Sequence, residues 1–241
     1  MTIRAVVFDI GGVLEITPRT GWGERWEARL GLAPGELRRR LGDVWRGGAV
    51  GAIAEADVER RTGEILGLER ADVDAFMADL WAEYLGTLNV ELAAYFGGLR
   101  PRYRTGILSN SFVGAREREE ARYGFGDLCD TIAYSHEEGL AKPDPLIYAL
   151  TCARLGVRPE ETIFLDDVAA CVDAARACGL HAILFRDTAQ AIADIEACLA
   201  ASGLKIEDHK LRIRDRARIC NLQSVICNRV RRGRRGGGRR A

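Results

Sequence analysis

The chain of 241 residues has no apolar run long enough to cross a membrane, and its first residues lack the charged and apolar regions of a signal peptide. Only Arg4 precedes a strand-like pattern that runs directly into Asp9. Hydrophobic residues make up 47% of the chain and charged residues 29%, a balance typical of folded globular proteins. We therefore expect a folded, cytoplasmic protein with no membrane partner.

The cysteines lack any pattern of metal ligands or disulfides. An odd number argues against a disulfide framework, and there is no CxxC pair or companion histidine spacing to suggest zinc. We expect buried, reduced thiols that pack as small hydrophobic side chains. The seven cysteines lie at positions 129, 152, 171, 178, 198, 220 and 227.

The chain has no net charge, but the two signs are unevenly distributed. From Lys205 onward lie 13 of the 35 Lys and Arg residues and only 3 of the 35 Asp and Glu residues, so an acidic body precedes a basic tail. Residues 204–241 end in Arg and Gly, which cannot bury apolar surface, and we expect this tail to be disordered. Its arginines could neutralise nucleic-acid phosphates. The lack of interleaved aromatic residues favours a solvated extension instead.

Five segments have the composition of buried parallel strands. They cover residues 3–8, 105–108, 131–135, 162–165 and 182–185. From residue 97 onward, strands alternate with segments of helical spacing, which cover residues 115–123, 145–155, 169–178 and 189–201. This alternation predicts an α/β fold in which a parallel sheet carries helices on both faces.

A long helical segment interrupts the alternation after the first strand. Residues from about 22 to 96 show helical spacing and no convincing strand, and one stretch places its apolar residues on one face of a helix. These residues are Val73, Phe76, Met77, Leu80, Trp81 and Tyr84. We predict a core of residues 1–15 and 97–203 with a helical insertion at 16–96. Core packing is the simplest role for the aromatic residues, although some could line a substrate pocket.

Polar residues suited to phosphate chemistry follow four of the predicted strands. Asp9 and Ser109 end two strands, Asp166 and Asp167 end a third, and Lys142 follows a fourth after a short loop. The carboxyl ends of parallel strands line one crevice of an open sheet, where ligands bind. The sequence therefore predicts one site built from four distant segments.

Asp9 is the candidate nucleophile of this site. It leaves an apolar strand and meets Gly11 and Gly12, whose lack of side chains lets a bulky anion approach the backbone. A carboxylate in this place could attack phosphorus and form an aspartyl-phosphate that water later hydrolyses.

The remaining residues offer the positive charge that such an attack needs. Asp9, Asp166 and Asp167 supply hard oxygen ligands of the kind that Mg²⁺ uses. Lys142 adds a positive charge against the phosphate, and the Ser109 hydroxyl can hydrogen-bond its oxygens. Singly, each residue could be a helix cap, a turn residue or a solvated charge. Complementary charges at one sheet edge favour a site.

Four ordered motifs resemble those of the haloacid dehalogenase-like hydrolases. They are FDIGGVL, ILSNS, the lysine of GLAKPDPLIY, and FLDDVAACVDAARACG, over roughly residues 3–200. The resemblance implies a Rossmann-like core with a small helical cap inserted after the first motif. It also implies a magnesium-dependent phosphatase that acts on a small phosphorylated metabolite through an aspartyl-phosphate.

The resemblance also implies roles for individual residues. Asp9, the nucleophile, and Lys142 are the catalytic residues, and Asp9, Gly11, through its carbonyl, Asp166 and Asp167 hold the metal. Asp167 is the preferred direct ligand of the last two. Phosphate binding falls to Lys142 together with Ser109, Asn110 and Gly12.

Two positions depart from the family pattern. Gly11 stands where phosphatases of the family commonly carry a second Asp that protonates the leaving group, so Glu15 or a carboxylate of the insertion is a candidate substitute. Cys171 stands where related sequences often have Asn near the metal. Two alternatives therefore stay open: a protein that binds a phosphorylated ligand without hydrolysing it, and a dehalogenase in which Asp9 attacks carbon.

Overall fold

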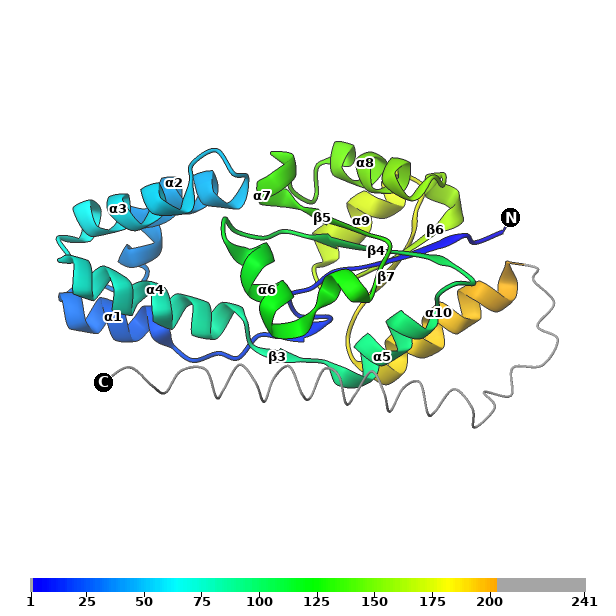
Figure 1. The fold of residues 1–241 in the computed structure, drawn as a ribbon, viewed down its shortest axis with the longest axis horizontal. Coiled ribbons are helices and arrows are strands. Elements are labelled where there is room, and N and C mark those ends of the chain that lie inside the picture. Colours follow the sequence, from blue (N-terminus) through cyan, green and yellow to red (C-terminus); the bar gives the residue numbers. More distant parts are fainter. Residues whose placement is uncertain (1, 203–241) are drawn as a thin grey trace.

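The computed structural model describes residues 2–202, and its centre is a five-stranded parallel sheet (Figure 1). The strands lie in the order β5–β4–β1–β6–β7, with every neighbouring pair parallel. They are β1 (Ala5–Phe8), β4 (Arg104–Ser109), β5 (Thr131–Tyr134), β6 (Thr162–Asp166) and β7 (His181–Leu184). The central strand β1 is buried along its whole length, as expected for a strand covered on both faces. The predicted Rossmann-like α/β fold is confirmed.

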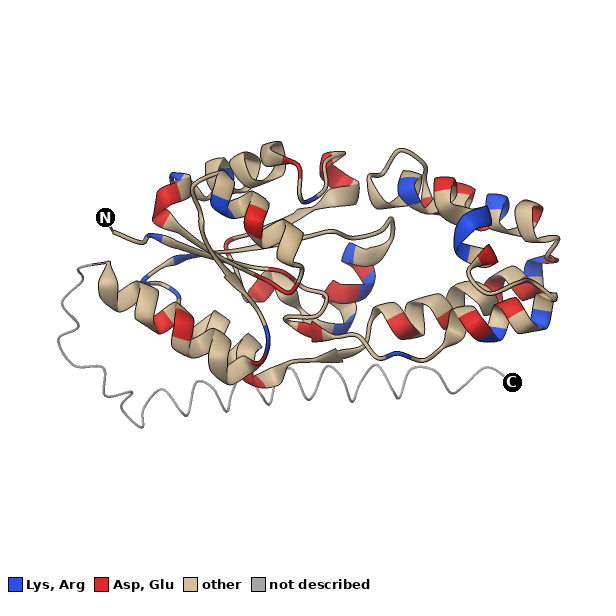
Figure 2. Cartoon of the chain, turned by 180° about the vertical axis from the view of Figure 1, so that it is seen from behind, with Lys and Arg blue, Asp and Glu red and all other residues tan. Residues whose placement is uncertain are grey.

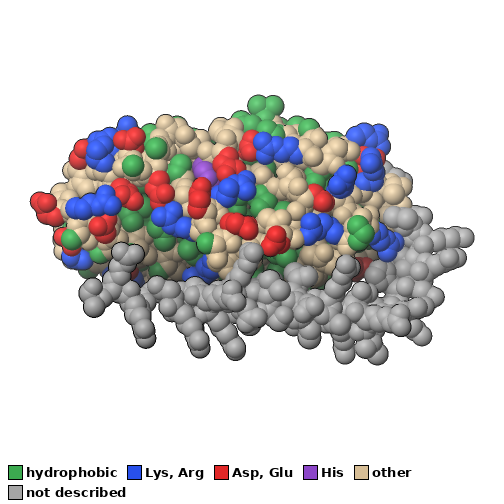
Figure 3. Space-filling model, viewed as in Figure 1, with side chains coloured by type: hydrophobic (Ala, Val, Ile, Leu, Met, Phe, Trp, Pro, Cys, Tyr) green, Lys and Arg blue, Asp and Glu red, His purple; other side chains and the backbone are tan. Residues whose placement is uncertain are grey.

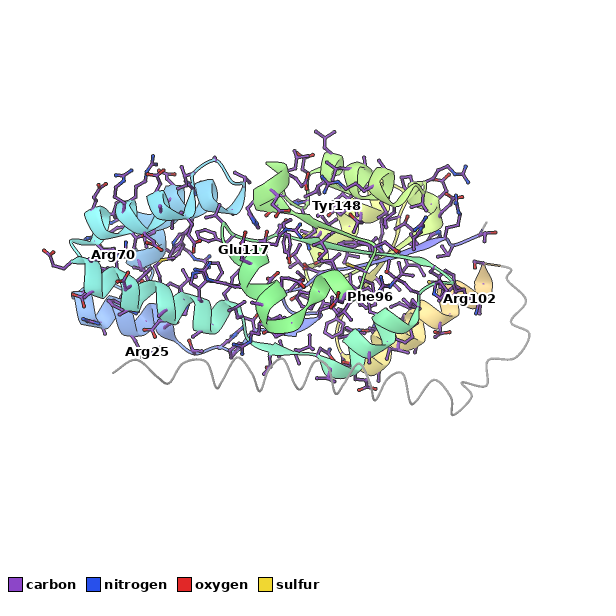
Figure 4. The ribbon with its side chains drawn as sticks, in the orientation of Figure 1. Arg25, Arg70, Phe96, Arg102, Glu117 and Tyr148 are labelled. Atoms are coloured by element: carbon purple, nitrogen blue, oxygen red, sulfur yellow. The ribbon has the colours of Figure 1, made fainter. Side chains whose placement is uncertain are left out.

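Helices cover both faces of this sheet. On one face lie α5 (Val90–Gly98) and α10 (Thr188–Ala201), and Phe96 stacks on Phe8 with ring centroids 4.5 Å apart. On the other face lie α8 (Pro145–Leu155) and α9 (Ala169–Ala177), where Tyr148 meets the edge of Phe164. Figure 4 labels Phe96 and Tyr148 on the two sides of the sheet. Two further helices, α6 (Ala115–Tyr123) and α7 (Ser135–Glu138), follow β4 and β5 at their carboxyl ends.

Four helices form a separate group at one end of the molecule (Figure 1). We call this group the helical insert; it comprises α1 (Trp22–Leu30), α2 (Glu36–Ala49), α3 (Glu55–Leu66) and α4 (Arg70–Tyr84). It has its own hydrophobic cluster, in which Trp22 and Trp26 both meet Phe76 edge-on. The apolar face predicted for α4 belongs to this cluster, so its core-packing role is confirmed.

Charged residues recur along the helices of the insert, and several form ion pairs at the surface (Figure 2). Exposed pairs such as Arg40 with Glu36 and Arg70 with Asp74 join neighbouring turns of one helix. In Figure 3, opposite charges lie side by side over the visible face of the described residues. Solvated pairs of this kind add little to stability. The insert therefore depends on its aromatic cluster.

The junction between the insert and the core differs from the expectation in two ways. Strand β2 (Glu15–Ile16) pairs antiparallel with β3 (Thr87–Leu88), in a region where no strand was expected. Two-residue strands are too short to show a period in the sequence. The sequence predicts that the insertion extends to residue 96. Helix α5 packs in the core instead, because its apolar residues Leu92, Ala93 and Phe96 meet the sheet.

The remaining expectations concern the termini and the cysteines. The predicted tail, residues 204–241, and two of the seven cysteines lie outside the described residues. The other five cysteines are free, and Cys129, Cys152 and Cys171 are buried. No helix between residues 2 and 202 is long and apolar enough to span a membrane.

Candidate active site

The centre of the site is a lysine held between two carboxylates. Lys142 Nζ lies 2.8 Å from Asp9 Oδ2 and 2.6 Å from Asp166 Oδ2. Strands β1 and β6 are neighbours, so their ends bring the two aspartates together, and Lys142 reaches them from the loop after α7. Lys142 is only 4% exposed and Asp166 is fully buried. Charges this deeply buried persist because they are paired.

A third carboxylate completes an acidic cluster. Asp9, Asp166 and Asp167 each offer an oxygen, and these oxygens lie within 4.8 Å of one another. Asp167 lies against the backbone of Gly12, where a Cβ atom would come within 2.2 Å of Asp167 Oδ2. Gly12 also has a φ of +73°, which favours glycine. Three converging carboxylates form the donor set of a hard divalent cation.

The electrostatics of the cluster favour an added positive charge. Burial raises the pKa of Asp9, the charge of Lys142 opposes this shift and the charge of Asp166 adds to it, so that the resulting pKa is about 7. Burial and the charge of Asp166 also raise the pKa of Asp167. Burial alone would lower the pKa of Lys142, but Asp9 and Asp166 outweigh it and raise that pKa. One lysine does not balance three carboxylates, and a divalent cation beside them would favour their ionised forms.

Two of the residues predicted to bind phosphate, Ser109 and Asn110, follow one another at the end of β4, and Asn110 contacts Lys142. Ser109, at the end of β4, is buried, and its hydroxyl lies 3.4 Å from the Asn110 carbonyl oxygen. The Asn110 side chain accepts a hydrogen bond from Lys142 N and donates one to Lys142 O, both at 2.8 Å. Asn110 therefore holds the backbone of the lysine. The predicted contact of Asn110 with substrate stays a prediction.

Asn110→Ala is expected to lower both stability and the rate of any reaction that uses Lys142. The substitution removes two hydrogen bonds that fix the Lys142 backbone, which corresponds to about 1–3 kcal/mol of unfolding free energy. A displaced ammonium group would reduce kcat by roughly tenfold. Urea unfolding and steady-state kinetics of the same preparation measure the two effects. Wild-type kcat in a destabilised variant would contradict the positioning role.

Two further carboxyls are buried near Asp9, and sequence reasoning identified only one of them. Glu15, the predicted substitute acid, lies in β2 and accepts a hydrogen bond from the Thr17 hydroxyl. Glu119 of α6 is fully buried and accepts a hydrogen bond of 2.6 Å from the Tyr134 hydroxyl. The charged run around Glu119 in the sequence gave no signal of its burial, because such runs usually form a solvated face.

The pKa values of these carboxyls reflect their surroundings. Burial, together with the charge of Glu119, raises the pKa of Glu15 to about 8. Burial and the charge of Asp9 raise the pKa of Glu119, the hydrogen bond from Tyr134 opposes them, and the resulting pKa is about 7. Both acids therefore keep a proton well above the usual pH range of a carboxyl.

Glu15→Gln is expected to stabilise the protein, and more strongly at pH 8 than at pH 5. The unfolded chain loses the Glu15 proton near pH 4.5, whereas the folded protein keeps it until about pH 8, so wild-type stability falls as pH rises through this window. The expected gain is on the order of a few kcal/mol at most. Urea unfolding at both pH values measures it. The exposed Glu91→Gln serves as the control, and an equal effect at the two pH values would contradict the assignment.

The fold and these side chains define an α/β protein with a buried, charge-paired site at the carboxyl edge of its sheet. The model of a family described as haloacid dehalogenase-like hydrolases matches residues 3–179. The chain belongs to this family, and the resemblance read from its four motifs is confirmed.

Three curated relatives extend this assignment. The chain is 30% identical over 204 residues to phosphatase MT3486 of Mycobacterium tuberculosis, covering 76% of this chain and 88% of that protein. It is 26% identical over 175 residues to D-ribitol-5-phosphate phosphatase of Bacteroides thetaiotaomicron, covering 68% and 83%. It is 27% identical to bifunctional epoxide hydrolase 2 of Sus scrofa, over 81% of this chain but only 39% of that longer protein.

A solved structure shares the fold. The HAD family enzyme bt-2542 of Bacteroides thetaiotaomicron, in complex with magnesium and inorganic phosphate, aligns with a TM-score of 0.65 at 22% identity. The alignment covers 76% of this chain and 94% of the other. The core and insert together therefore follow the arrangement of that enzyme.

Proposed function

We propose that this protein is a magnesium-dependent phosphatase of a small phosphorylated metabolite. The observation that carries the proposal is the position of Asp9, which is paired with a buried lysine and lies within a cluster of three carboxylates. Two relatives are phosphatases by name, and the structural neighbour bt-2542 binds magnesium and phosphate. These likenesses support the same chemistry here.

Each site residue has a distinct role in the proposed reaction. Asp9 attacks the phosphorus atom with one carboxylate oxygen; the bond from phosphorus to the leaving oxygen breaks, and an aspartyl-phosphate forms. Water then attacks the phosphorus atom, which releases phosphate and restores Asp9. Lys142 and the Ser109 hydroxyl bind the phosphoryl oxygens.

A magnesium ion, when bound by Asp9, Asp166 and Asp167, supplies positive charge against the phosphoryl oxygens. The donor set fits this ion because all three carboxylates converge and because one buried lysine pairs with two of them without balancing the charge of the three. The Gly11 carbonyl is a further proposed ligand. Lys142 keeps Asp9 oriented by direct pairing at 2.8 Å.

The helical insert acts as a cap over this site in the proposed reaction. Strand β2, which begins four residues after Gly11, leads from the core into the insert. Strand β3, which ends just before α5, leads back into the core and pairs with β2. A cap that closes over the substrate excludes water while the covalent intermediate forms. The residues on the inner face of the insert would then determine which metabolite binds.

Phosphate release from a generic aryl phosphate, measured with magnesium and with excess chelator, tests the proposal. We expect turnover with magnesium, none with chelator, and recovery when magnesium is restored. A screen of phosphorylated sugars, sugar alcohols and amino sugars then identifies the substrate. Halide release from a 2-haloacid in the presence of chelator would instead establish the dehalogenase alternative. Tight binding of phosphorylated ligands without turnover would establish the binding protein.

A further inference from the structure

The stretch of chain that begins at the end of β4, residues 109–113, has partners in both parts of the molecule; we call it the 109–113 segment. On one side, the Asn110 side chain forms hydrogen bonds with the backbone N and O of Lys142. On the other side, Phe112 and Val113 pack against the hydrophobic cluster of the helical insert. One short segment therefore contacts both the candidate active site and the insert.

The last turn of the insert helix α2 is bound directly to this segment. Val113 N donates a hydrogen bond of 3.1 Å to the carbonyl oxygen of Gly48, which is buried. A Cβ atom at Gly48 would lie only 2.5 Å from Cε2 of the Phe112 ring. This close approach depends on glycine, because any side chain at position 48 would push the helix and the segment apart.

Ser135, the first residue of α7, links the same two parts by a second route. Its hydroxyl accepts a hydrogen bond of 2.8 Å from Ser111 N and donates one of 2.7 Å to the Ala49 carbonyl oxygen of α2. The Ser111 hydroxyl oxygen also lies 2.6 Å from Nδ1 of His136. In Figure 1, the end of α2 lies beside α7. Ser135 is fully buried, so leaving its hydroxyl without these partners would be costly.

We propose that Gly48 and Ser135 are positioning residues that hold the 109–113 segment against the insert. The segment in turn fixes Ser109 and, through Asn110, the backbone of Lys142. The insert would thus set the geometry of the phosphate-binding residues in addition to enclosing the substrate. The kinetic consequence rests on the proposed phosphatase function, whereas the contact itself can be tested without activity.

Gly48→Ala tests the contact, because its methyl group would meet the Phe112 ring. Gly42→Ala is the matched control, since it lies in the same helix and a Cβ atom there would meet only the end of the Arg46 side chain, at 3.4 Å. Alanine favours the helix at both positions, so an effect on helix stability would appear in both variants. We expect amide hydrogen exchange in the 109–113 segment, measured by mass spectrometry, to become roughly five- to tenfold faster in Gly48→Ala and to stay at the wild-type rate in Gly42→Ala.

In the kinetic assay with an aryl phosphate and magnesium, Gly48→Ala is expected to lower kcat/KM by roughly tenfold, because the phosphate-binding residues are displaced. Phe112→Leu removes the two ring atoms nearest to the added methyl group, Cε2 and Cζ. In the double variant we therefore expect both kcat/KM and hydrogen exchange to return to within about twofold of Phe112→Leu alone. A merely destabilised insert would not be rescued in this way, because leucine also removes aromatic packing.

The outcomes separate this inference from the proposed function. Wild-type exchange in Gly48→Ala, an equal change in Gly42→Ala, or no recovery in the double variant overturns the positioning role. Faster exchange with unchanged kcat/KM in an active enzyme overturns it as well. A selective change in exchange that Phe112→Leu relieves, in a protein without phosphatase activity, supports the contact and rejects the phosphatase.

Ser135→Ala decides the matter if Gly48→Ala does not fold. This substitution removes the hydroxyl that joins Ser111 to the Ala49 carbonyl and adds no atom. Faster exchange in the 109–113 segment together with a lower kcat/KM would support the proposal. Wild-type values of both quantities would overturn it.

Discussion

Asp9→Asn is expected to reduce phosphate release by at least roughly a thousandfold, the largest loss expected of any single substitution in this chain. An amide has no anionic oxygen with which to attack phosphorus, and it cannot pair as a charge with Lys142, 2.8 Å away. Steady-state release of phosphate measures the loss. Mass analysis of acid-quenched protein during turnover is expected to show a phosphoryl adduct in the wild type and none in the variant.

This loss is expected without a loss of stability. Burial raises the pKa of Asp9 to about 7, which shows that the folded protein disfavours the charge that Asn removes. Lys142 keeps its pairing with Asp166 at 2.6 Å in the variant. Urea unfolding near pH 8 is therefore expected to show equal or greater stability for Asp9→Asn than for the wild type.

Asp173→Asn is the matched control for Asp9→Asn. Asp173 lies in α9 on the surface, with a side chain that is 73% exposed and pairs only with its neighbour Arg176 among the ion pairs of the described chain. Its substitution is expected to leave phosphate release unchanged. Substantial turnover by Asp9→Asn, or a comparable loss in Asp173→Asn, would remove Asp9 from the role of nucleophile.

The strands and their terminal residues could be predicted because they follow from local composition. A buried parallel strand has apolar residues on both faces, as Ala5–Phe8 shows. The polar residues of the site follow directly where such an apolar run ends. Asp9, Ser109 and Asp166 each stand at such an end, so the rule that strand ends share one crevice was enough to bring them together. The lysine was harder to place, since it reaches the site from a loop.

The contacts between the insert and the core could not be predicted in the same way. The residues around Glu119 alternate acid and base, the pattern of a solvated helix, and only the position of Tyr134 in a neighbouring strand explains why this one carboxyl is buried.

The structure also bears on the missing general acid at position 11. An ideal Cβ built on Gly11 meets no atom within 4 Å, whereas one built on Gly12 comes within 2.2 Å of Asp167. Gly11 lies two residues beyond Asp9, and a longer side chain there would extend into open space. A side chain at position 11 is therefore compatible with the fold, while one at position 12 is not.

Gly11→Asp is expected to increase kcat/KM for alkyl phosphates by about ten- to a hundredfold. The new carboxyl can protonate the leaving oxygen, a contribution of about a hundred- to ten-thousand-fold when the acid is optimally placed. Aryl phosphates with weakly basic leaving groups need this proton less, so we expect little gain for them. Measuring kcat/KM across a series of leaving groups tests this, because the dependence on leaving-group basicity should flatten in the variant.

Two variants keep this test specific. Gly11→Asn has the same shape without an acidic proton and is expected to show no gain, so an equal gain would point to packing or binding instead of proton transfer. Gly12→Ala is expected to lose activity, because its methyl group would displace Asp167 and its φ of +73° is strained for alanine. If Gly11→Asp gains nothing and the wild type already shows a flat dependence, another acid serves the leaving group. Repeating the series in Glu15→Gln then shows whether Glu15, buried four residues farther along the chain, is that acid.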